Sequence, residues 1–347
     1  MIKVKKEGVL IQKTDNNFEN EGVLNPAVIH NNNHINLFYR AVENGNYSSI
    51  GYCKLNTPLT IQERMMKPLL IPEFEYESHG IEDPRITQID DTFYLTYTAY
   101  DGVNALGALA ISTDLEHFKK LGIITPKITY QEFNRLTKHN HHINEKYLRY
   151  NEHGGLQEKD GKKVLVWDKN IVFFPKRING KLYFLHRIRP DIQIVAVNNL
   201  QDLNAGFWQH YFWHLEDNIV LSPQYKHEVS YIGAGCPPIE TIHGWLLIYH
   251  GVHDTVNGYV YSACAALLDL QNPQQEIARL PYPLFKPELD WETKGEVNNV
   301  CFPTGAVLIS DTLYIYYGAA DERIACASMS ISALLEELLI NKKQEVI

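Results

Sequence analysis

Five stretches of the chain repeat one pattern, and this repeat constrains the fold more than any other feature. They begin at residues 25, 83, 170, 235 and 299, so the intervals between them are 58, 87, 65 and 64 residues. Each has a polar or proline-rich start, a short apolar strand, a tight turn and an aromatic strand, and a further small apolar strand usually follows. Such spacing is typical of β-propeller blades. We therefore predict an all-β fold, a single five-bladed β-propeller over residues 1–347.

Two segments fall outside the repeat. The long second interval predicts a polar insertion between blades 2 and 3, at about residues 127–166. Its HNHH run at 139–142 is interpreted as an exposed loop, because no Cys/His set suited to zinc accompanies it, so we predict no metal site. The sequence SISALLEELLINKK predicts one short C-terminal helix at about 330–343.

Polar residues recur at both ends of the repeated strands. Because the innermost strands of a propeller surround one axis, these residues are predicted to meet in one central pocket. The alternative is that the starting Asn and Asp residues only cap turns, which would not explain the polar groups at the other strand ends. The starting residues are Asn25, Asp83, Asn170 and Asn299, and the groups after the aromatic strands are Arg40, Asp101, Arg187, His250 and Asp321.

Charge and composition exclude several classes of partner. The formal charge of −9 argues against nucleic acid and anionic membranes as partners. No window reaches about 18 consecutive apolar residues, so no membrane span is expected. The start MIKVKKEGVLIQ has no apolar run long enough for a signal peptide, and five widely spaced cysteines fit a reducing compartment. We expect a cytoplasmic protein.

Many motifs, in order from about residue 22 to 328, resemble glycoside hydrolase family 130. They include GVLNPAV, GIEDPRIT, YLTYTAYDG, IGAGCPPIET, NVCFPTGAV and YYGAAD. The resemblance implies a five-bladed propeller that acts on β-mannosides with inversion and needs no cofactor. Most members are phosphorylases, which use phosphate to release α-mannose 1-phosphate, and a smaller group hydrolyses β-1,2-mannosides. The oligomeric state is left open.

The resemblance implies that Asp83, in the Glu-Asp-Pro-Arg motif, is the catalytic acid, working directly or through a hydroxyl of the bound sugar. An inverting enzyme also needs a nucleophile on the opposite face of the sugar. A phosphorylase uses phosphate in this role and needs a basic pocket. A hydrolase needs a second carboxylate to activate water.

The motifs favour a hydrolase over a phosphorylase. In the phosphorylase pattern of the family that the chain resembles, phosphate is bound at four positions. This sequence keeps the residue types of that pattern there, as Lys169, Asn170, Arg187 and His250. Two other basic positions of the phosphorylase pattern differ in this sequence. Tyr231 replaces the Lys that usually precedes IGAG, and Glu240 replaces the basic residue of the PPI[KR]T motif. A carboxylate would repel phosphate but could activate water, as could Glu228.

We therefore predict a β-1,2-mannosidase with Asp83 as general acid and Glu228 or Glu240 activating water. A β-mannoside phosphorylase, with phosphate as co-substrate, and a non-catalytic sugar-binding propeller remain alternatives. Arg40, Asn46 and Ser49 are placed near the pocket end of the first blade. The predicted substrate-binding residues are Asn25, Arg40, Ser49, Tyr100, Asp101, Lys169, Asn170, His186, Arg187, Tyr231, His250 and Asp321.

Overall fold

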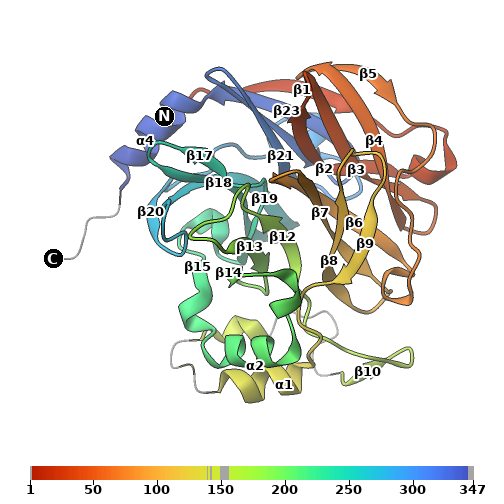
Figure 1. Ribbon diagram of the computed structural model, residues 1–347. Helices are drawn as coiled ribbons and strands as arrows, with labels where there is room; N and C mark the ends of the chain where they lie inside the picture. Colours follow the sequence, from red (N-terminus) through yellow and green to blue (C-terminus); the bar gives the residue numbers. More distant parts are fainter. Residues whose placement is uncertain (1, 139, 141–142, 149–155, 343–347) are drawn as a thin grey trace.

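The computed structural model describes residues 2–138, 140, 143–148 and 156–342. It is built mainly of antiparallel β-sheets, with a pair of helices at one end (Figure 1). The predicted all-β class is confirmed. Residues 139, 141 and 142 of the HNHH run and residue 343 lie outside the described residues.

The first two repeats form the two halves of one eight-stranded sheet. A single parallel pairing, between Ser48 and Gly80, joins the halves. The first half contains β2 (Gly22–Asn31), β3 (His34–Glu43), β4 (Tyr47–Thr57) and β5 (Thr60–Arg64). The second half contains β6 (Gly80–Ile89), β7 (Thr92–Tyr100), β8 (Ala105–Ser112) and β9 (Lys119–Ile123).

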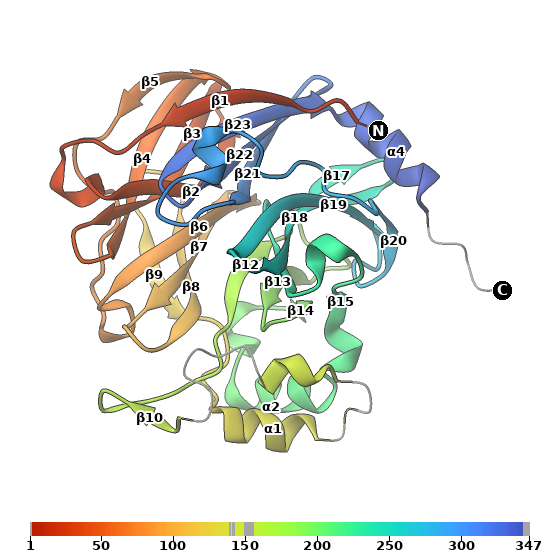
Figure 2. The ribbon, with the colours of Figure 1, turned by 180° about the vertical axis from the view of Figure 1, so that it is seen from behind.

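The other three repeats form separate antiparallel sheets. The third contains β12 (Lys169–Phe173), β13 (Leu182–Arg187), β14 (Ile192–Val197) and β15 (Ile219–Leu221). The fourth contains β16 (Tyr231–Ala234), β17 (Ile239–Thr241), β18 (Gly244–Thr255), β19 (Gly258–Leu268) and β20 (Glu276–Arg279). The fifth contains β21 (Cys301–Ile309), β22 (Thr312–Ala319) and β23 (Arg323–Ser330), completed by β1 (Lys5–Ile11) from the start of the chain (Figures 1 and 2).

Hydrophobic clusters join each repeat to the next. One cluster lies between the first and second repeats, and others between the second and third, the third and fourth, and the fourth and fifth. A further cluster packs Tyr316 and Cys326 of the fifth repeat against Leu37 and Tyr39 of the first. The last repeat is thus packed against the first, and burial of apolar side chains holds this contact together.

The helices lie outside these sheets. The stretch predicted as an insertion holds α1 (Tyr130–Thr137), η3 (Glu145–Leu148) and a hairpin of β10 (Glu158–Lys159) and β11 (Lys162–Lys163). Helix α1 packs against α2 (Ala205–Trp213), a helix that we did not predict, with the Phe133 and Phe212 rings 5.4 Å apart (Figure 1). Helix α4 (Ile331–Ile340) is the expected C-terminal helix, and Ser330 caps its N-terminus. The remaining short helices are η1 (Asn17–Glu19), η2 (Glu75–Glu77), η4 (Leu200–Asp202), η5 (Glu216–Asn218), η6 (Lys226–Glu228) and α3 (Asp290–Thr293).

No helix among the described residues is both long and apolar enough to span a membrane.

Candidate functional site

A backbone irregularity repeats at the start of the inner strands. Asn25, Asp83, Asn170 and Asn299 have left-handed φ angles of 52°, 49°, 56° and 63°. The first three lie at register shifts in β2, β6 and β12. Asn and Asp tolerate this conformation better than other non-glycine residues, and a bulge redirects the side chain. The sequence repeat thus reflects one local geometry used several times.

The side chains of Asn25, Asp83 and Asn170 line one pocket, whereas Asn299, which was predicted to join them, is not among its lining residues. Its volume is about 140 Å³. Residues from the first, second, third, fourth and fifth repeats contribute to it. Its lining also includes Arg40, Lys169, Arg187, Arg189, Tyr261, Val300, Phe302 and Asp321.

Asp83 is buried in this pocket among positive charges. Asn25 donates a hydrogen bond from Nδ2 to Asp83 Oδ1 over 2.7 Å, and Arg40 Nη1 lies 3.8 Å from the same oxygen. Burial acts to raise the pKa of Asp83, but the charges of Arg40, Lys169 and Arg85 outweigh it and lower the pKa. The carboxyl group is therefore ionised at neutral pH when these cations have no other partner.

Arg40 is held in place by neighbouring polar groups. Its Nε donates to Ser48 Oγ over 2.8 Å, and its Nη2 lies 2.9 Å from Glu82 Oε1. Ser48, rather than the predicted Ser49, contacts it, because successive side chains of a strand point to opposite faces. Glu82 also lies 3.5 Å from Lys169 Nζ and so helps to fix both cations.

Lys169, Arg187 and Arg189 form one wall of the pocket, which we call the cation wall. Burial and the nearby Arg189 lower the pKa of Arg187 to about 10. Burial and the same arginines lower the pKa of His250, whose Nε2 lies 3.3 Å from Arg187 Nη1. A neutral imidazole next to these guanidinium groups leaves the wall positive and suited to an anion.

Tyr231 does not remove positive charge from this wall. The Arg189 guanidinium lies 3.9 Å from the centre of the Tyr231 ring, and that of Arg187 lies 5.3 Å from it. The phenol thus supports two cations by cation–π contact. Sequence reasoning missed Arg189, Tyr261 and Phe302. The HRIRP motif carried only a weak signal for Arg189, a second Arg close to Arg187, because Arg189 lies in the turn after β13 where strand periodicity does not apply.

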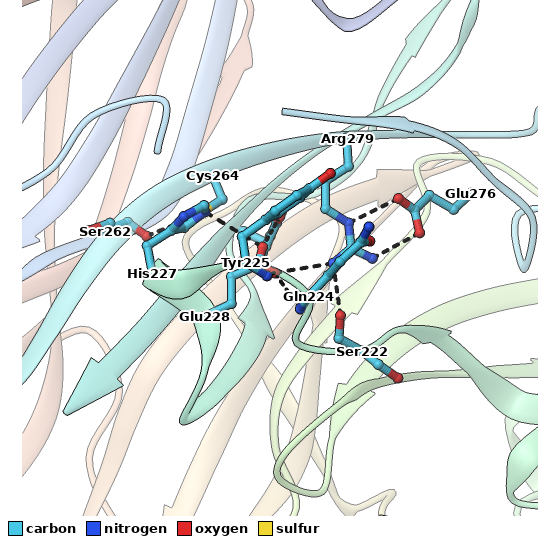
Figure 3. Close-up of polar contacts among 10 residues, drawn as sticks. Ser222, Gln224, Tyr225, His227, Glu228, Ser262, Cys264, Glu276 and Arg279 are labelled. Carbon is cyan, nitrogen blue, oxygen red and sulfur yellow. Dashed lines mark hydrogen bonds and ion pairs between the residues drawn. The ribbon is translucent and has the colours of Figure 1, made fainter. Parts of the chain in front are cut away.

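Glu228 is fully buried away from solvent and has a structural set of partners (Figure 3). Its Oε2 accepts hydrogen bonds from the backbone N–H groups of Gln224 and Tyr225, over 2.9 and 3.2 Å, and lies 3.3 Å from Arg279 Nη1. Its Oε1 accepts a bond from the Tyr249 hydroxyl. Both oxygens are therefore engaged by protein groups, and the side chain is closed off from solvent, which is the setting of a structural carboxylate.

The same arrangement recurs in three other repeats. In each, a buried Glu in the turn before the inner strand accepts a hydrogen bond from the hydroxyl of a Tyr on the next strand. The same Glu forms an ion pair with a basic residue. We call this arrangement the Glu–Tyr–cation latch. Besides Glu228–Tyr249–Arg279, its members are Glu19–Tyr39–Arg64, Glu77–Tyr97–Lys120 and Glu292–Tyr317–Lys6.

In the third repeat a different buried group takes the place of the latch. His186 Nδ1 lies 2.8 Å from Asp168 Oδ2, and its Nε2 lies 2.7 Å from the Tyr211 hydroxyl. His186 is fully buried on the α2 side of β13. It was predicted to bind substrate, but the structure directs it into the core.

His227, Glu228 and Cys264 place three potential metal-ligand atoms within 4.8 Å of one another. Figure 3 shows that Arg279 contacts the same carboxylate. Because Glu228 is already engaged by a guanidinium, a phenol and two amides, we assign no metal to this cluster.

Three further predicted residues lie outside the pocket lining. Glu240 is exposed on β17 and pairs with Lys176 at 2.5 Å. Asp101 caps a turn, because its Oδ1 accepts hydrogen bonds from the backbone N–H groups of Val103 and Asn104, over 2.8 and 2.7 Å. The Tyr100 hydroxyl donates to the Gly102 carbonyl over 2.9 Å.

Asp321 brings a second carboxyl group to the pocket. Burial, with repulsion from Asp83, raises its pKa to about 6. Because this value exceeds the usual one, ionisation of Asp321 destabilises the fold, by an amount that grows from about pH 4 to pH 6 and then stays constant. One pKa unit corresponds to about 1.36 kcal/mol, so full ionisation of Asp321 lowers the free energy of unfolding by about 3 kcal/mol.

We expect Asp321→Asn to raise the free energy of unfolding by about 2 kcal/mol more at pH 8 than at pH 4.5. Asn also tolerates the left-handed φ of 50° at this position. Urea unfolding of the variant and of an exposed control, Asp91→Asn, at both pH values measures the difference. An effect of equal size at both pH values would contradict the raised pKa.

Comparisons with known proteins agree over nearly the whole chain. A family model of glycoside hydrolase 130, described as β-1,4-mannooligosaccharide phosphorylase, matches residues 4–339. A β-1,2-mannobiose phosphorylase of Thermoanaerobacter sp. (strain X514) is 34% identical, covering 94% of this chain and 96% of the relative. A 1,2-β-oligomannan phosphorylase of the same strain is 32% identical, covering 95% of this chain and 98% of the relative.

Among solved structures, a β-1,2-mannobiose phosphorylase from Listeria innocua, in complex with β-1,2-mannobiose, superposes with a TM-score of 0.74. It is 23% identical, and the match covers 98% of this chain and 100% of that one. At this identity the likeness supports the fold. The comparisons indicate no cofactor.

The prediction of a hydrolase is wrong. The characterised relatives matched over most of this chain are phosphorylases of β-1,2-mannosides. The structure gives the physical reason: Arg189 lies over the Tyr231 ring, Glu240 pairs with Lys176, and Glu228 belongs to a latch. The two replacements that indicated a hydrolase therefore leave the cation wall intact.

Proposed function

Because this chain belongs to glycoside hydrolase family 130, we propose that it is an inverting phosphorylase that transfers mannose from β-1,2-linked mannosides to phosphate. One observation carries the proposal. Asp83, a buried acid, shares a pocket of about 140 Å³ with Lys169, Arg187 and Arg189. That is the set a phosphorylase requires, one proton donor and one anion site.

The proposed reaction is a single displacement. A phosphate oxygen, held by the cation wall, attacks the anomeric carbon of the terminal mannose. The bond from that carbon to the leaving oxygen breaks, and the Asp83 proton reaches this oxygen, directly or through a sugar hydroxyl. The products are α-mannose 1-phosphate and a sugar shortened by one unit.

Phosphate binding also explains how Asp83 becomes an acid. In the free protein, Arg40, Lys169 and Arg85 lower its pKa. A phosphate dianion near Lys169 offsets part of that positive potential and adds a negative charge, and both effects raise the pKa of Asp83. Phosphate binding therefore favours the protonated form of Asp83, which is the form that can donate a proton to the leaving oxygen.

We assign sugar binding to the uncharged and acidic groups of the pocket. Asn25 and Asn170 offer amide groups, and Arg40 and Asp321 offer a donor and an acceptor for hydroxyl groups. Asn25 also donates a hydrogen bond to Asp83 over 2.7 Å, so it connects the bound sugar with the catalytic acid.

We further infer that the five repeats are the blades of one propeller domain, with the segment at about 127–166 inserted after the second. The clusters that join successive repeats, and the packing of the fifth against the first, support a closed ring. Pairing of β1 with β23 supports the same inference. In such a ring the bulged inner strands would face the pocket.

The reverse reaction tests the proposed function. Purified protein with α-mannose 1-phosphate and mannose should form β-1,2-mannobiose and release phosphate in equal amounts. A colorimetric phosphate assay with chromatography of the sugars measures both products. Release of phosphate without a disaccharide, or the absence of any reaction, would contradict the proposal.

We expect Arg189→Gln to raise KM for phosphate by about 10- to 100-fold. The loss of one charge-assisted hydrogen bond costs about 1.5–3 kcal/mol, and 1.4 kcal/mol corresponds to tenfold in affinity. Initial rates at varied phosphate measure the change, with the exposed Arg177→Gln as the matched control. An unchanged KM for phosphate in Arg189→Gln would remove this residue from the anion site.

A further inference from the structure

A tyrosine of the segment between the second and third repeats lies next to the cation wall. Tyr147, on η3, is buried and lines a small void of about 10 Å³ together with Arg187 and Arg189. Its ring stacks on that of Phe133 from α1, with the ring centres 5.8 Å apart. The ring is thus fixed by packing, and its hydroxyl reaches the turn that carries Arg189.

The Tyr147 hydroxyl joins two buried polar side chains. It donates a hydrogen bond to Asp191 Oδ2 over 2.6 Å and accepts one from Gln193 Nε2 over 2.9 Å. Asp191 and Gln193 are both buried, so water is not at hand to replace the hydroxyl. A buried polar group that loses its partner destabilises its surroundings, because its desolvation is no longer compensated. Both side chains therefore depend on this one hydroxyl.

Hydrogen bonds fix the turn between β13 and β14, residues 188–191. Gln193 closes the turn, since its Oε1 accepts from the Ile188 N–H and its Nε2 donates to the Ile188 carbonyl, both over 2.8 Å. The Pro190 carbonyl accepts from the Ile232 N–H of the fourth repeat over 3.0 Å. The backbone on both sides of residue 189 is thus held in place.

Arg189 depends on this turn for its position in the cation wall. Its guanidinium lies 3.9 Å from the centre of the Tyr231 ring, and it makes no hydrogen bond or ion pair with another residue that the structure describes. A guanidinium binds phosphate through hydrogen bonds of defined geometry. A shift of the turn would therefore weaken phosphate binding.

The same short helix is also fastened to the fourth repeat. Lys146 donates a hydrogen bond from Nζ to the carbonyl of Val229, which precedes Tyr231 by two residues. Tyr231 provides the ring on which Arg189 lies. Helix η3 thus contacts both parts of the chain that hold this arginine.

We propose that Tyr147 is a positioning residue for the phosphate site. Its hydroxyl holds the turn that carries Arg189, by way of Asp191 and Gln193, so that a segment outside the five repeats sets the affinity for phosphate. The inference rests on the proposed function for the assignment of phosphate to the cation wall. It predicts a selective effect, because none of the groups assigned to sugar binding belongs to this turn.

Tyr147→Phe tests the inference, since it removes the hydroxyl and keeps the ring that packs on Phe133. We expect KM for phosphate in the phosphorolysis of β-1,2-mannobiose to rise about tenfold, whereas kcat and KM for the disaccharide stay within about twofold. Calorimetric titration of inorganic phosphate should show an affinity about tenfold lower than that of the wild type.

The matched control is Tyr316→Phe. The Tyr316 hydroxyl is also buried, and it donates to the Pro58 carbonyl over 2.8 Å in the contact between the fifth and first repeats. This variant loses a buried hydrogen bond of the same kind, yet it should keep the wild-type KM and affinity for phosphate.

The inference would be overturned if phosphate affinity in Tyr147→Phe stayed within about twofold of the wild type, or if Tyr316→Phe lost as much. An equal loss of disaccharide affinity in Tyr147→Phe would also overturn it. Failure of the proposed function is distinguishable. If the wild type bound phosphate but did not cleave the disaccharide with it, the function would be wrong, and the calorimetric comparison would still decide the inference. Absence of phosphate binding by the wild type would overturn both.

Discussion

Replacement of Asp83 by Asn is expected to lower kcat for the phosphorolysis of β-1,2-mannobiose by about 10³-fold. General acid catalysis contributes typically about 10²–10⁴ in rate, and an amide cannot donate the proton that a carboxylic acid donates to the leaving oxygen. Asn retains the size of the side chain and tolerates the left-handed φ of 49°. The rate of mannose 1-phosphate formation measures the effect.

The control for this variant lies in the same repeat. Asp90, at the exposed β6–β7 turn, also has a left-handed φ, of 52°. Asp90→Asn makes the same chemical change on the same hairpin and should retain the wild-type rate. Equal thermal unfolding temperatures of the two variants would show that the fold is intact. If Asp83→Asn kept more than half of the wild-type kcat, Asp83 would not be the acid.

The second large effect concerns stability. Glu228→Gln should lower the free energy of unfolding by about 3 kcal/mol, because removal of one partner of a buried ion pair typically costs about 3–5 kcal/mol. Arg279 keeps its contact with Glu276, at 2.9 Å, which places the expected loss at the low end. Urea unfolding at 25 °C measures it. The kcat of the folded variant should stay within about twofold of the wild type.

Glu240→Gln provides the contrast. Glu240 forms an exposed pair with Lys176, and such pairs are worth about 0–1 kcal/mol. This variant should change neither stability nor kcat appreciably. The pair of variants separates a structural from a catalytic role for the two carboxylates. Loss of turnover in Glu228→Gln at unchanged stability would contradict the latch and restore Glu228 as a catalytic candidate.

Much of the fold could be predicted from local sequence. Turn residues, strand periodicity and the repeated Asn or Asp at the strand starts are all local, and each has a local physical cause in the backbone. The left-handed residues Asn25, Asp83 and Asn170 were found because their conformation restricts the residue types. Helix α2 was missed, since its aromatic sequence AGFWQHYFW fits a strand as well as a buried helix.

The candidate site was harder to predict, because it depends on contacts distant in sequence. Replacement of a Lys by Tyr231 suggested a lost charge, yet Arg189 supplies one from the turn between β13 and β14. Glu228 was taken for a base because a carboxylate near a motif does not reveal its partners. The spacing of the latches carried a signal, since each Glu precedes its Tyr by 20, 20, 21 or 25 residues.

The most direct test of the central claim is the fate of β-1,2-mannobiose, followed by ¹H and ³¹P NMR with and without phosphate. We predict one α-mannose 1-phosphate and one mannose per disaccharide with phosphate, and no cleavage without it. Two mannose molecules per disaccharide, formed at the same rate in phosphate-free buffer, would contradict the account.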